Sequence, residues 1–396
     1  MLVKMLDAGM NVARLDFSDG DHKTHAQSLE NLREALKQRP DKSCAVLMDM
    51  KGPEICTGFL RDNKPIDIVQ GQTLKIVTDF AIEGDANKIA CSYKSLPKTV
   101  HVGSKIVIAD GALTCDVTEI HDEFVQVVCK NSIRLGEKKS VNLPGSIIDM
   151  PSLTEKDEDD LLEFGIKFGV DFVAASFVRK KTDLDTIRDI LGGKGSNIKI
   201  ISKIENNEGL QNFEEILEVS DGILVARQQL GMEIPPEKVF IAQKWMAEKA
   251  NLQSKPVIIS TQVLDSMVKA SRPNRAEASD VCNAVMDGAD CIMLQNETAA
   301  GDYPINAVSI LGKICAEAEK TINYRETFNT MKLYTPKPIH TSEAVAAAAC
   351  QAVLDQKEIT LIIVLSDTGK LARLVAKYRP EVNILACSLN SAAVRQ

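Results

Sequence analysis

The chain has 396 residues, with 47 basic and 55 acidic side chains and a formal net charge of −8. This balance argues against a protein that gains its affinity by coating nucleic acid or an anionic membrane. With 44% hydrophobic and 26% charged residues, the composition is that of an ordinary globular protein. Aromatic residues make up only 4%, which argues against stacking platforms for single-stranded nucleic acid. The length favours two to three domains.

Ten cysteines are scattered along the chain, and no two of them form a Cys-x-x-Cys pair. The sequence therefore favours free thiols in a reducing cytoplasm over a zinc or redox motif. The first ten residues are too polar for a signal peptide, and no apolar run approaches the ~20 residues that span a bilayer. We expect a cytoplasmic protein.

The strongest pattern is a short apolar run followed by a longer amphipathic stretch. Both faces of each run are mostly apolar, which predicts buried strands. The intervening segments, such as 181–191, 210–219 and 237–250, have helical character. Strand starts recur at about 25–35 residues in the second half, which is the pitch of repeated βα units. The pattern favours a (β/α)8 barrel, with seven strands visible. The runs are Val12–Phe17, Ala45–Met50, Phe172–Val178, Ile198–Ile204, Gly222–Ala226, Val257–Thr261 and Cys291–Gln295.

One long insertion breaks this rhythm. Alternating apolar runs punctuated by glycines, with no convincing helix, predict a small all-β domain between the second and third strands. Pro144-Gly145 marks the return to the barrel, and Thr154 has the features of a helix N-cap. The expected domains are residues 1–53 (first part of the barrel), 54–146 (inserted β domain), 147–325 (second part of the barrel) and 326–396 (a C-terminal α/β domain).

The last region follows a predicted helix at 305–322 and a loop with Pro336 and Pro338. Its predicted elements are a helix at 342–354, a strand at 360–365, a helix at 371–378 and a strand at 383–387. The chain stops just after that strand, so we expect a C-terminal domain that is short of a core.

Polar side chains occur together at the carboxyl ends of several predicted strands. In a barrel these ends converge on one site, so the accumulation predicts a catalytic mouth. Lys203 and Glu205 form the sharpest pair, because a carboxylate can hold Mg²⁺ or Mn²⁺ beside a lysine that stabilises developing negative charge. The residues at these ends are Arg14, Asp16, Ser18, Asp49, Lys51, Lys203, Glu205, Thr261 and Glu297.

Several longer motifs resemble the pyruvate kinase family over nearly the whole chain. They include GMNVARLDFS (9–18), KGPE (51–54), SFVR (176–179), SKIENNEG (202–209), RPNRAEASDV (272–281) and DGADCIML (287–294). The resemblance implies a barrel that lacks the family's first strand, an inserted β-barrel domain acting as a lid, and a truncated C-terminal α/β domain. It also implies phosphoryl transfer from phosphoenolpyruvate to ADP with Mg²⁺ or Mn²⁺ and K⁺, and a homo-oligomer, which in this family is usually a tetramer.

The family motifs also carry residue roles onto this chain. The resemblance makes Lys203, Arg14, Thr261 and Glu297 the catalytic residues, with Lys203 at the transferring phosphoryl group and Arg14 at the phosphate. It places Gln228 and Gln229 at the substrate, and Glu205 and Gln229 at the divalent metal. The implied K⁺ ligands are Asp16, Ser18, Asp49 and the Met50 carbonyl. The implied nucleotide-binding residues are Ser18, Asp19, Cys56 and Lys139.

Several of these positions depart from the family pattern. Gln229 replaces the second metal carboxylate, Gln228 replaces a glycine, and Cys56 replaces a phosphate-binding arginine. Asp16 and Asp19 replace an asparagine and a histidine. Together these changes make the mouth two charge units more negative than the family pattern. Because each misplaced unit charge at ~4 Å costs about 1–4 kcal/mol, the sequence predicts impaired turnover of two polyanionic substrates.

Three hypotheses remain open from the sequence. The chain is a pyruvate-kinase-type phosphotransferase with reduced turnover, a non-catalytic paralogue that binds partners or subunits, or a truncated product that does not fold alone. A milder reading of the departures is also open, in which Asp16 makes a better K⁺ site and Gln229 is tolerated.

Overall fold

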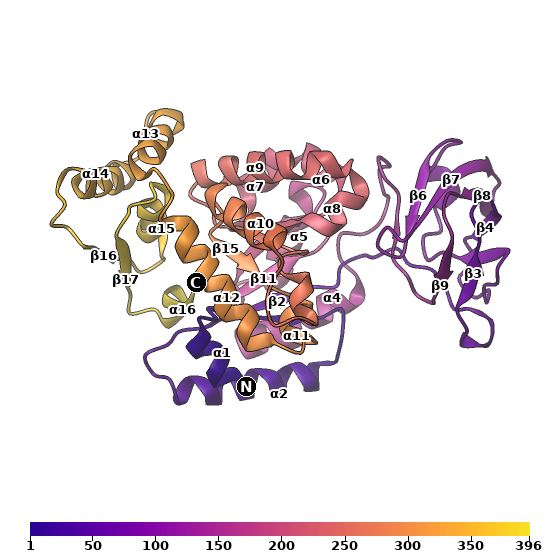
Figure 1. Ribbon diagram of the computed structural model, residues 1–396, viewed down its shortest axis with the longest axis horizontal. Helices are drawn as coiled ribbons and strands as arrows, with labels where there is room; N and C mark the ends of the chain where they lie inside the picture. The colour runs from indigo at the N-terminus through magenta and orange to yellow at the C-terminus, as the bar shows by residue number, and fades with distance from the viewer.

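A curled sheet of seven parallel strands forms the centre of the molecule, in the order β1-β2-β11-β12-β13-β14-β15 (Figure 1). The structure is a computed structural model that describes residues 1–396. The sheet confirms the predicted α/β barrel class with seven strands, and β1 and β15 form its two edges. The strands are β1 (Val12–Asp16), β2 (Ala45–Asp49), β11 (Phe172–Ala175), β12 (Lys199–Ile204), β13 (Gly222–Ala226), β14 (Val257–Ser260) and β15 (Cys291–Met293).

Burial along the strands follows their place in the sheet. Every residue of β2 and of β13 is buried, because these inner strands have helices outside and barrel side chains inside. Every residue of the edge strands β1 and β15 is only half-buried. A strand at an edge lacks one neighbour, so its side chains and backbone lose cover on that side.

Helices on the outside of the sheet bury a core of 34 residues against it. The stretch 210–219, predicted as one helix, is divided into α6 and α7 because Asn212 leaves helical geometry and donates to the Arg179 carbonyl at 2.8 Å. The elements of this layer are α1 (Leu2–Ala8), α2 (His22–Lys37), α4 (Glu155–Asp159), η2 (Asp160–Ile166), α5 (Lys181–Leu191), α6 (Asn207–Gln211), α7 (Phe213–Val219), α8 (Arg227–Glu233), α9 (Pro236–Leu252), η3 (Asp265–Val268), α10 (Arg275–Met286), α11 (Asn296–Ala299) and α12 (Pro304–Glu319).

Thr154 caps α4, as the sequence predicts. Its hydroxyl accepts from the Asp157 amide, and the Asp157 carboxylate accepts from the Thr154 amide at 2.9 Å. The same carboxylate accepts from the Gly52 amide at 3.0 Å, so it joins the end of β2 to the helix that re-enters the barrel. The Thr154 hydroxyl donates to it as well, at 2.6 Å, so three donors hold this fully buried carboxylate.

Replacing Asp157 with alanine is expected to lower the free energy of unfolding of the barrel by about 2–4 kcal/mol, because three donors lose a charged acceptor. Urea unfolding followed by Trp245 fluorescence measures this loss. Glu155→Ala is the matched control, since Glu155 is exposed in the same helical turn. Equal midpoints for the two variants would contradict the capping role.

Residues 55–143 build a separate β unit at the right of Figure 1. Its six-stranded sheet has the order β10-β6-β7-β8-β4-β5, and β3 pairs with β9. Twenty-one buried residues form its core. The prediction of no helix is wrong at one place, where Pro97 starts the short α3 (Leu96–Thr99). The strands are β3 (Ile66–Ile68), β4 (Thr73–Val77), β5 (Lys88–Ala90), β6 (Lys105–Ile108), β7 (Leu113–Ile120), β8 (Phe124–Cys129), β9 (Ile133–Leu135) and β10 (Val141–Asn142), and a 3₁₀ turn covers Arg61–Asn63.

The C-terminal region lies on the opposite side of the barrel (Figure 1). Its two parallel strands are β16 (Leu361–Leu365) and β17 (Asn383–Cys387), and its helices are α13 (Tyr324–Tyr334), α14 (Thr341–Asp355), α15 (Lys370–Lys377) and α16 (Ser391–Arg395). The sequence missed α13, which the Asn323 side chain caps and whose Phe328 packs against Tyr378. It also missed α16, whose Arg395 binds Asp171 of the barrel at 2.9 Å.

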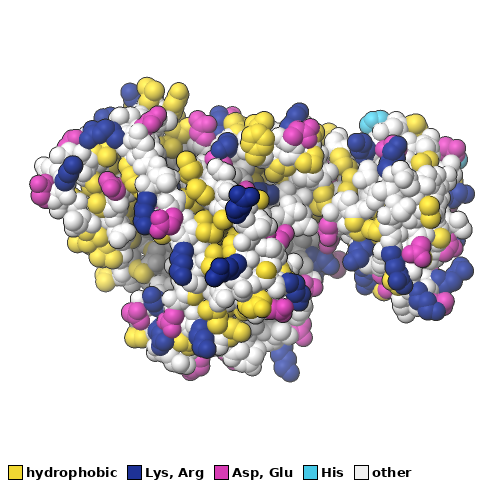
Figure 2. Space-filling model, in the orientation of Figure 1, with side chains coloured by type: hydrophobic (Ala, Val, Ile, Leu, Met, Phe, Trp, Pro, Cys, Tyr) yellow, Lys and Arg dark blue, Asp and Glu magenta, His cyan; other side chains and the backbone are white.

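The surface carries both signs of charge. Figure 2 shows Lys and Arg side chains interspersed with Asp and Glu over the visible face, without a continuous basic stripe. None of the helices is at once long enough and apolar enough to cross a membrane.

Candidate active site

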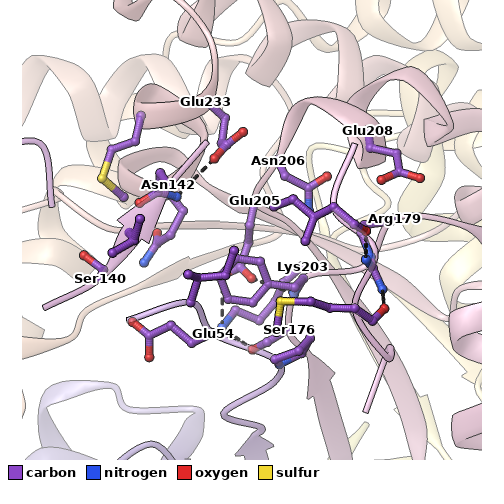
Figure 3. Close-up of a pocket in the computed structure, with 18 of the residues that line it drawn as sticks. Glu54, Ser140, Asn142, Ser176, Arg179, Lys203, Glu205, Asn206, Glu208 and Glu233 are labelled. Carbon is purple, nitrogen blue, oxygen red and sulfur yellow. Dashed lines mark hydrogen bonds and ion pairs between the residues drawn. The ribbon is translucent and has the colours of Figure 1, made fainter. Parts of the chain in front are cut away.

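A partly open cleft with about 140 Å³ of accessible space lies where the carboxyl ends of the barrel strands meet the β unit. Figure 3 shows its polar side chains converging from β10, from the loop after β2 and from the ends of β11 and β12. Five carboxylates face three cations in this cleft. The polar lining residues are Ser18, Lys51, Glu54, Asp110, Ser140, Asn142, Ser146, Ser176, Arg179, Lys203, Glu205, Asn206, Glu208, Gln229 and Glu233.

A chain of alternating charges connects three strand ends beneath the cleft. Asp16 accepts from Arg14 at 2.9 Å, and Arg14 donates to Asp49 at 2.6 Å. The second oxygen of Asp49 accepts from Lys203 at 2.9 Å, and the Lys203 amine lies 3.3 Å from Glu205. Asp16 and Asp49 are register partners on β1 and β2, so the parallel pairing itself brings these groups together.

This arrangement keeps Asp49 and Lys203 charged although burial disfavours both charges. Burial alone would lower the pKa of Lys203, but the carboxylates of Asp49 and Glu205 outweigh burial and raise it. Burial alone would raise the pKa of Asp49, yet Lys203 and Arg14 bring it below its ordinary value. Lys203 is therefore a permanent cation, and its side chain is 13% exposed at the cleft. A fixed cation in a partly dry site stabilises an anion more strongly than a cation in water.

Ser176 gives Lys203 a further partner. The Lys203 amine donates to the Ser176 hydroxyl at 2.8 Å, and that hydroxyl donates to the Met50 carbonyl at 2.6 Å. Oxygen atoms of Asp49, Ser176 and Glu205, from the ends of β2, β11 and β12, therefore surround the amine, and Figure 3 shows Ser176 and Glu205 beside it. Ser176 is not among the predicted site residues, although its place in the SFVR motif directly after β11 is the signal that could identify it.

Glu205 and Gln229 are the two residues that the sequence predicts for the divalent metal, and both line the cleft. One oxygen of Glu205 accepts from the Phe177 amide at 2.7 Å, which orients the carboxylate. The side-chain oxygen of Gln229 is buried and has no hydrogen-bond partner. An unpartnered oxygen in the same cleft as an oriented carboxylate fits a hard cation such as Mg²⁺ or Mn²⁺, although an amide is a weaker ligand than a carboxylate.

Thr261 has a strained backbone. Its φ of +68° is unusual for a β-branched residue, and such strain marks functional sites. The Thr261 hydroxyl accepts from the Gln228 amide at 2.8 Å, which ties the end of β14 to the start of α8. Arg227 holds the strained turn by donating to the Thr261 carbonyl at 2.9 Å and the Gln262 carbonyl at 2.8 Å. Neither Thr261 nor Gln228 lines the cleft itself.

The predicted K⁺ ligands lie at the ends of β1 and β2. The Ser18 amide donates to Asp16 at 3.0 Å, and the Met50 carbonyl accepts from Ser176. Both oxygens of Asp49 are engaged by Arg14 and Lys203. A K⁺ ion at this place would therefore share the charge of Asp49 with two side-chain cations.

The remaining predicted residues lie away from the centre of the cleft. Cys56 and Ser140 pair through an isolated antiparallel β-bridge of the backbone. Lys139 directly precedes Ser140, so Cys56 and Lys139 lie on neighbouring segments of the β unit. Asp19 is exposed near the end of β1. Glu297 is buried, and its carboxylate accepts from the amides of Leu264 and Gln295 at 3.0 and 2.8 Å. In this structure Glu297 shapes two loops and does not line the cleft.

Sequence reasoning also missed the residues that connect the β unit to the barrel. Arg179 donates to the carbonyls of Ile148 and Met150 at 2.5 and 2.6 Å, and Asn142 donates to Glu233 at 3.1 Å. Figure 3 shows the Asn142–Glu233 bond across one side of the cleft. Because Glu233 ends α8, whose first turn carries Gln228 and Gln229, this bond connects the β unit to the helix of the predicted metal ligand.

Burial raises the pKa of Glu233, and the hydrogen bond from Asn142 only partly offsets it. Between the ordinary pKa of glutamate and the raised pKa of Glu233, the folded chain keeps a proton that the unfolded chain has released. The free energy of unfolding therefore falls as pH rises through this range. Glu233→Gln removes the titration and keeps an oxygen acceptor for Asn142. We expect the variant to be more stable than the parent at pH 8 and equally stable near about pH 3.5, below the ordinary pKa of glutamate. Urea titrations at the two pH values measure this, and a more stable parent at pH 8 would contradict it.

Taken with the fold, the cleft defines an α/β-barrel protein whose site is built from the carboxyl ends of its parallel strands. The family "Pyruvate kinase, barrel domain" matches residues 1–308, and "Pyruvate kinase, alpha/beta domain" matches residues 343–396. The chain belongs to the pyruvate kinase family.

Individual relatives agree with this membership. The chain is 52% identical to a pyruvate kinase of Eimeria tenella over all of its own length and 74% of that protein. It is 49% identical to a cytosolic isozyme of Nicotiana tabacum, over 98% of this chain and 76% of the relative. A crystal structure of a Cryptosporidium parvum pyruvate kinase superposes with a TM-score of 0.96 at 47% identity, covering 100% of this chain and 81% of that one. Another, in complex with ADP, has a TM-score of 0.90 at 46% identity and covers 79% of that chain.

Proposed function

We propose that this chain transfers a phosphoryl group from phosphoenolpyruvate to ADP, giving pyruvate and ATP, at a reduced rate. The observation that carries the proposal is the Lys203 amine, held by Asp49 and Ser176 at 2.9 and 2.8 Å and directed to a cleft that Glu205 and Gln229 also line. Phosphoryl transfer demands mainly positioning and neutralisation of charge on the transferring group, and a fixed lysine beside metal ligands supplies both.

In this proposal each strand end has one task. Lys203 neutralises the phosphoryl oxygens while the bond to the enolic oxygen breaks and the bond to the ADP oxygen forms. Arg14 binds the phosphate, and Thr261 holds the Gln228 amide at the start of α8. Glu205 and Gln229 would hold Mg²⁺ or Mn²⁺, which when bound supplies positive charge to the substrate oxygens. The groups at the ends of β1 and β2 would hold K⁺.

The reduced rate follows from the substituted positions. Gln229 offers the metal a neutral oxygen in place of a charged one, and Cys56 brings no cation to the nucleotide. Asp16 neutralises part of the Arg14 charge, since the two charged groups are 2.9 Å apart. Arg14 is half-buried there and faces Asp49 as well, so two carboxylates compete with substrate phosphate for one guanidinium.

The proposal extends to the organisation of the protein. Residues 54–146 act as a lid over the cleft, residues 1–53 and 147–325 form the barrel domain, and residues 326–396 form a C-terminal domain. The relatives include isozymes named as cytosolic, which supports a cytoplasmic location. We propose a homo-oligomer, as the family resemblance implies. Size-exclusion chromatography with light scattering tests the oligomer.

Purified protein in a lactate-dehydrogenase-coupled assay tests the activity. We expect pyruvate production that requires phosphoenolpyruvate, ADP and Mg²⁺ and that rises with K⁺. Omitting Mg²⁺ while adding a chelator gives the blank. A well-folded protein that binds Mn²⁺ and forms no pyruvate would overturn the enzymatic proposal and favour the non-catalytic paralogue.

A further inference from the structure

Two cysteines face each other in the core of the β unit, and neither lines the cleft. Cys115 on β7 and Cys129 on β8 are direct register partners in an antiparallel pair. The neighbouring pair, Thr114 and Lys130, carries a backbone hydrogen bond between the strands, from the Lys130 amide to the Thr114 carbonyl. The Cys115–Cys129 position is therefore a non-hydrogen-bonded one, where strands bring Cα atoms to about 4.5 Å and side chains closest together.

The two sulfur atoms are already in contact. Their Sγ atoms are 3.8 Å apart, and both side chains belong to the apolar core of the β unit at 0% and 1% exposure. A Cα separation of about 4.5 Å lies within the range that disulfides span, so the bond needs a small rotation of the side chains and no movement of the strands.

The pair is also asymmetric. The Cys115 thiol donates its hydrogen bond to the Cys129 sulfur, which lowers the pKa of Cys129 and raises that of Cys115. By contrast, burial alone raises the pKa of Cys350 to about 12, and no second cysteine lies against it. Since the thiolate is the nucleophile in disulfide exchange, this direction favours Cys129 as the attacking sulfur of the pair.

We propose that Cys115 and Cys129 are an oxidation site, at which a low-molecular-weight disulfide converts the two thiols into a cross-strand disulfide in the β unit. The Cys129 thiolate attacks one sulfur of the external disulfide, and the first small thiolate leaves. The Cys115 sulfur then attacks the Cys129 sulfur of the mixed disulfide, and the second small thiolate leaves. The two protons of the protein thiols pass to the two released thiolates, so one external disulfide is reduced as one protein disulfide forms.

Oxidation is reached through transient opening of the β unit, because both sulfurs are buried in the closed state. The new bond closes a loop of about 15 residues and restricts the unfolded chain. At about 3 kcal/mol for such a loop, we expect the oxidised β unit to melt roughly 12–24 °C higher than the reduced one. The site depends on this packing alone and is independent of the proposed phosphoryl transfer.

Tryptic mapping tests the site directly. No Lys or Arg lies between Lys105 and Lys130, so trypsin releases both cysteines in the single peptide 106–130. The whole protein is equilibrated with oxidised glutathione, alkylated under denaturing conditions and digested. We expect peptide 106–130 to lose two hydrogens and take up no alkyl group, and to take up two alkyl groups after dithiothreitol treatment.

Cys129→Ala and Cys350→Ala are the matched variants, since each removes one buried thiol and only the first breaks the pair. We expect the rise in melting temperature on oxidation to disappear in Cys129→Ala and to persist in Cys350→Ala. Peptide 106–130 with two alkyl groups, or with glutathione on either cysteine at equilibrium, would overturn the proposal. If Cys129→Ala does not fold, the peptide map of the parent protein still decides the question.

Discussion

Replacing Lys203 with methionine is expected to lower the rate of phosphoryl transfer about 10³-fold. Methionine keeps an unbranched side chain that is one atom shorter and removes the positive charge that stabilises the phosphoryl oxygens, and loss of one such electrostatic group costs about 10²–10³ in turnover. Asp49 would also lose one of its two cations while it stays 1% exposed. The coupled pyruvate assay measures the rate, and circular dichroism confirms that the variant is folded.

Lys249→Met is the matched control for this change. Lys249 pairs with Glu214 at 2.6 Å on the outside of the barrel and takes no part in the cleft. We expect its turnover to equal that of the parent. A Lys203→Met protein that retains the parent's turnover would remove the central residue from the proposed mechanism.

The double replacement of Gln229 by aspartate and Cys56 by arginine is expected to raise turnover at least about tenfold. The aspartate restores a charged ligand beside Glu205, and we expect Mn²⁺ to bind about 10–100-fold more tightly. The arginine adds a cation near Lys139, which is expected to lower the KM for ADP. A tenfold rise in turnover corresponds to about 1.36 kcal/mol of barrier. One restored unit charge at ~4 Å contributes about 1–4 kcal/mol, so a part of the restored charge gives the expected rise.

Calorimetric titration with Mn²⁺ separates metal binding from catalysis in this experiment. Gln253→Asp makes the same chemical change in an exposed loop after α9 and should leave Mn²⁺ affinity unaltered. A parent that already turns over as fast as the double variant would show that the substituted site is not impaired.

The barrel was predictable because its signal is local and repeated. Each inner strand is buried on both faces, so a run such as Gly222–Ala226 reads as apolar at every position, and the structure has that strand at the same residues. The cap at Thr154 was predictable for a related reason, since the hydroxyl and the carboxylate three residues later act within one helical turn. Lys203 and Glu205 were identifiable because both lie at one strand end.

Contacts between segments that are far apart along the chain could not be predicted from the sequence. Ser176 was missed because its partners, Lys203 and the Met50 carbonyl, lie on other strands. Asn142 and Glu233 are 91 residues apart and each is unremarkable in its own segment. The helix α13 was hidden because its apolar face is narrow and its stability comes from Phe328 against Tyr378.

The order in which the chain is synthesised matters for a fold arranged this way. The helix α1 packs against α12, which is about 300 residues later and needs roughly 15–60 s of synthesis at 5–20 residues per second. Arg395 reaches back to Asp171 across 224 residues. The 21 core residues of the β unit, by contrast, all lie between Ile55 and Leu143. The β unit can therefore fold on the ribosome while the apolar side of α1 waits for its partner, and pulse proteolysis of stalled nascent chains would detect that sequence of events.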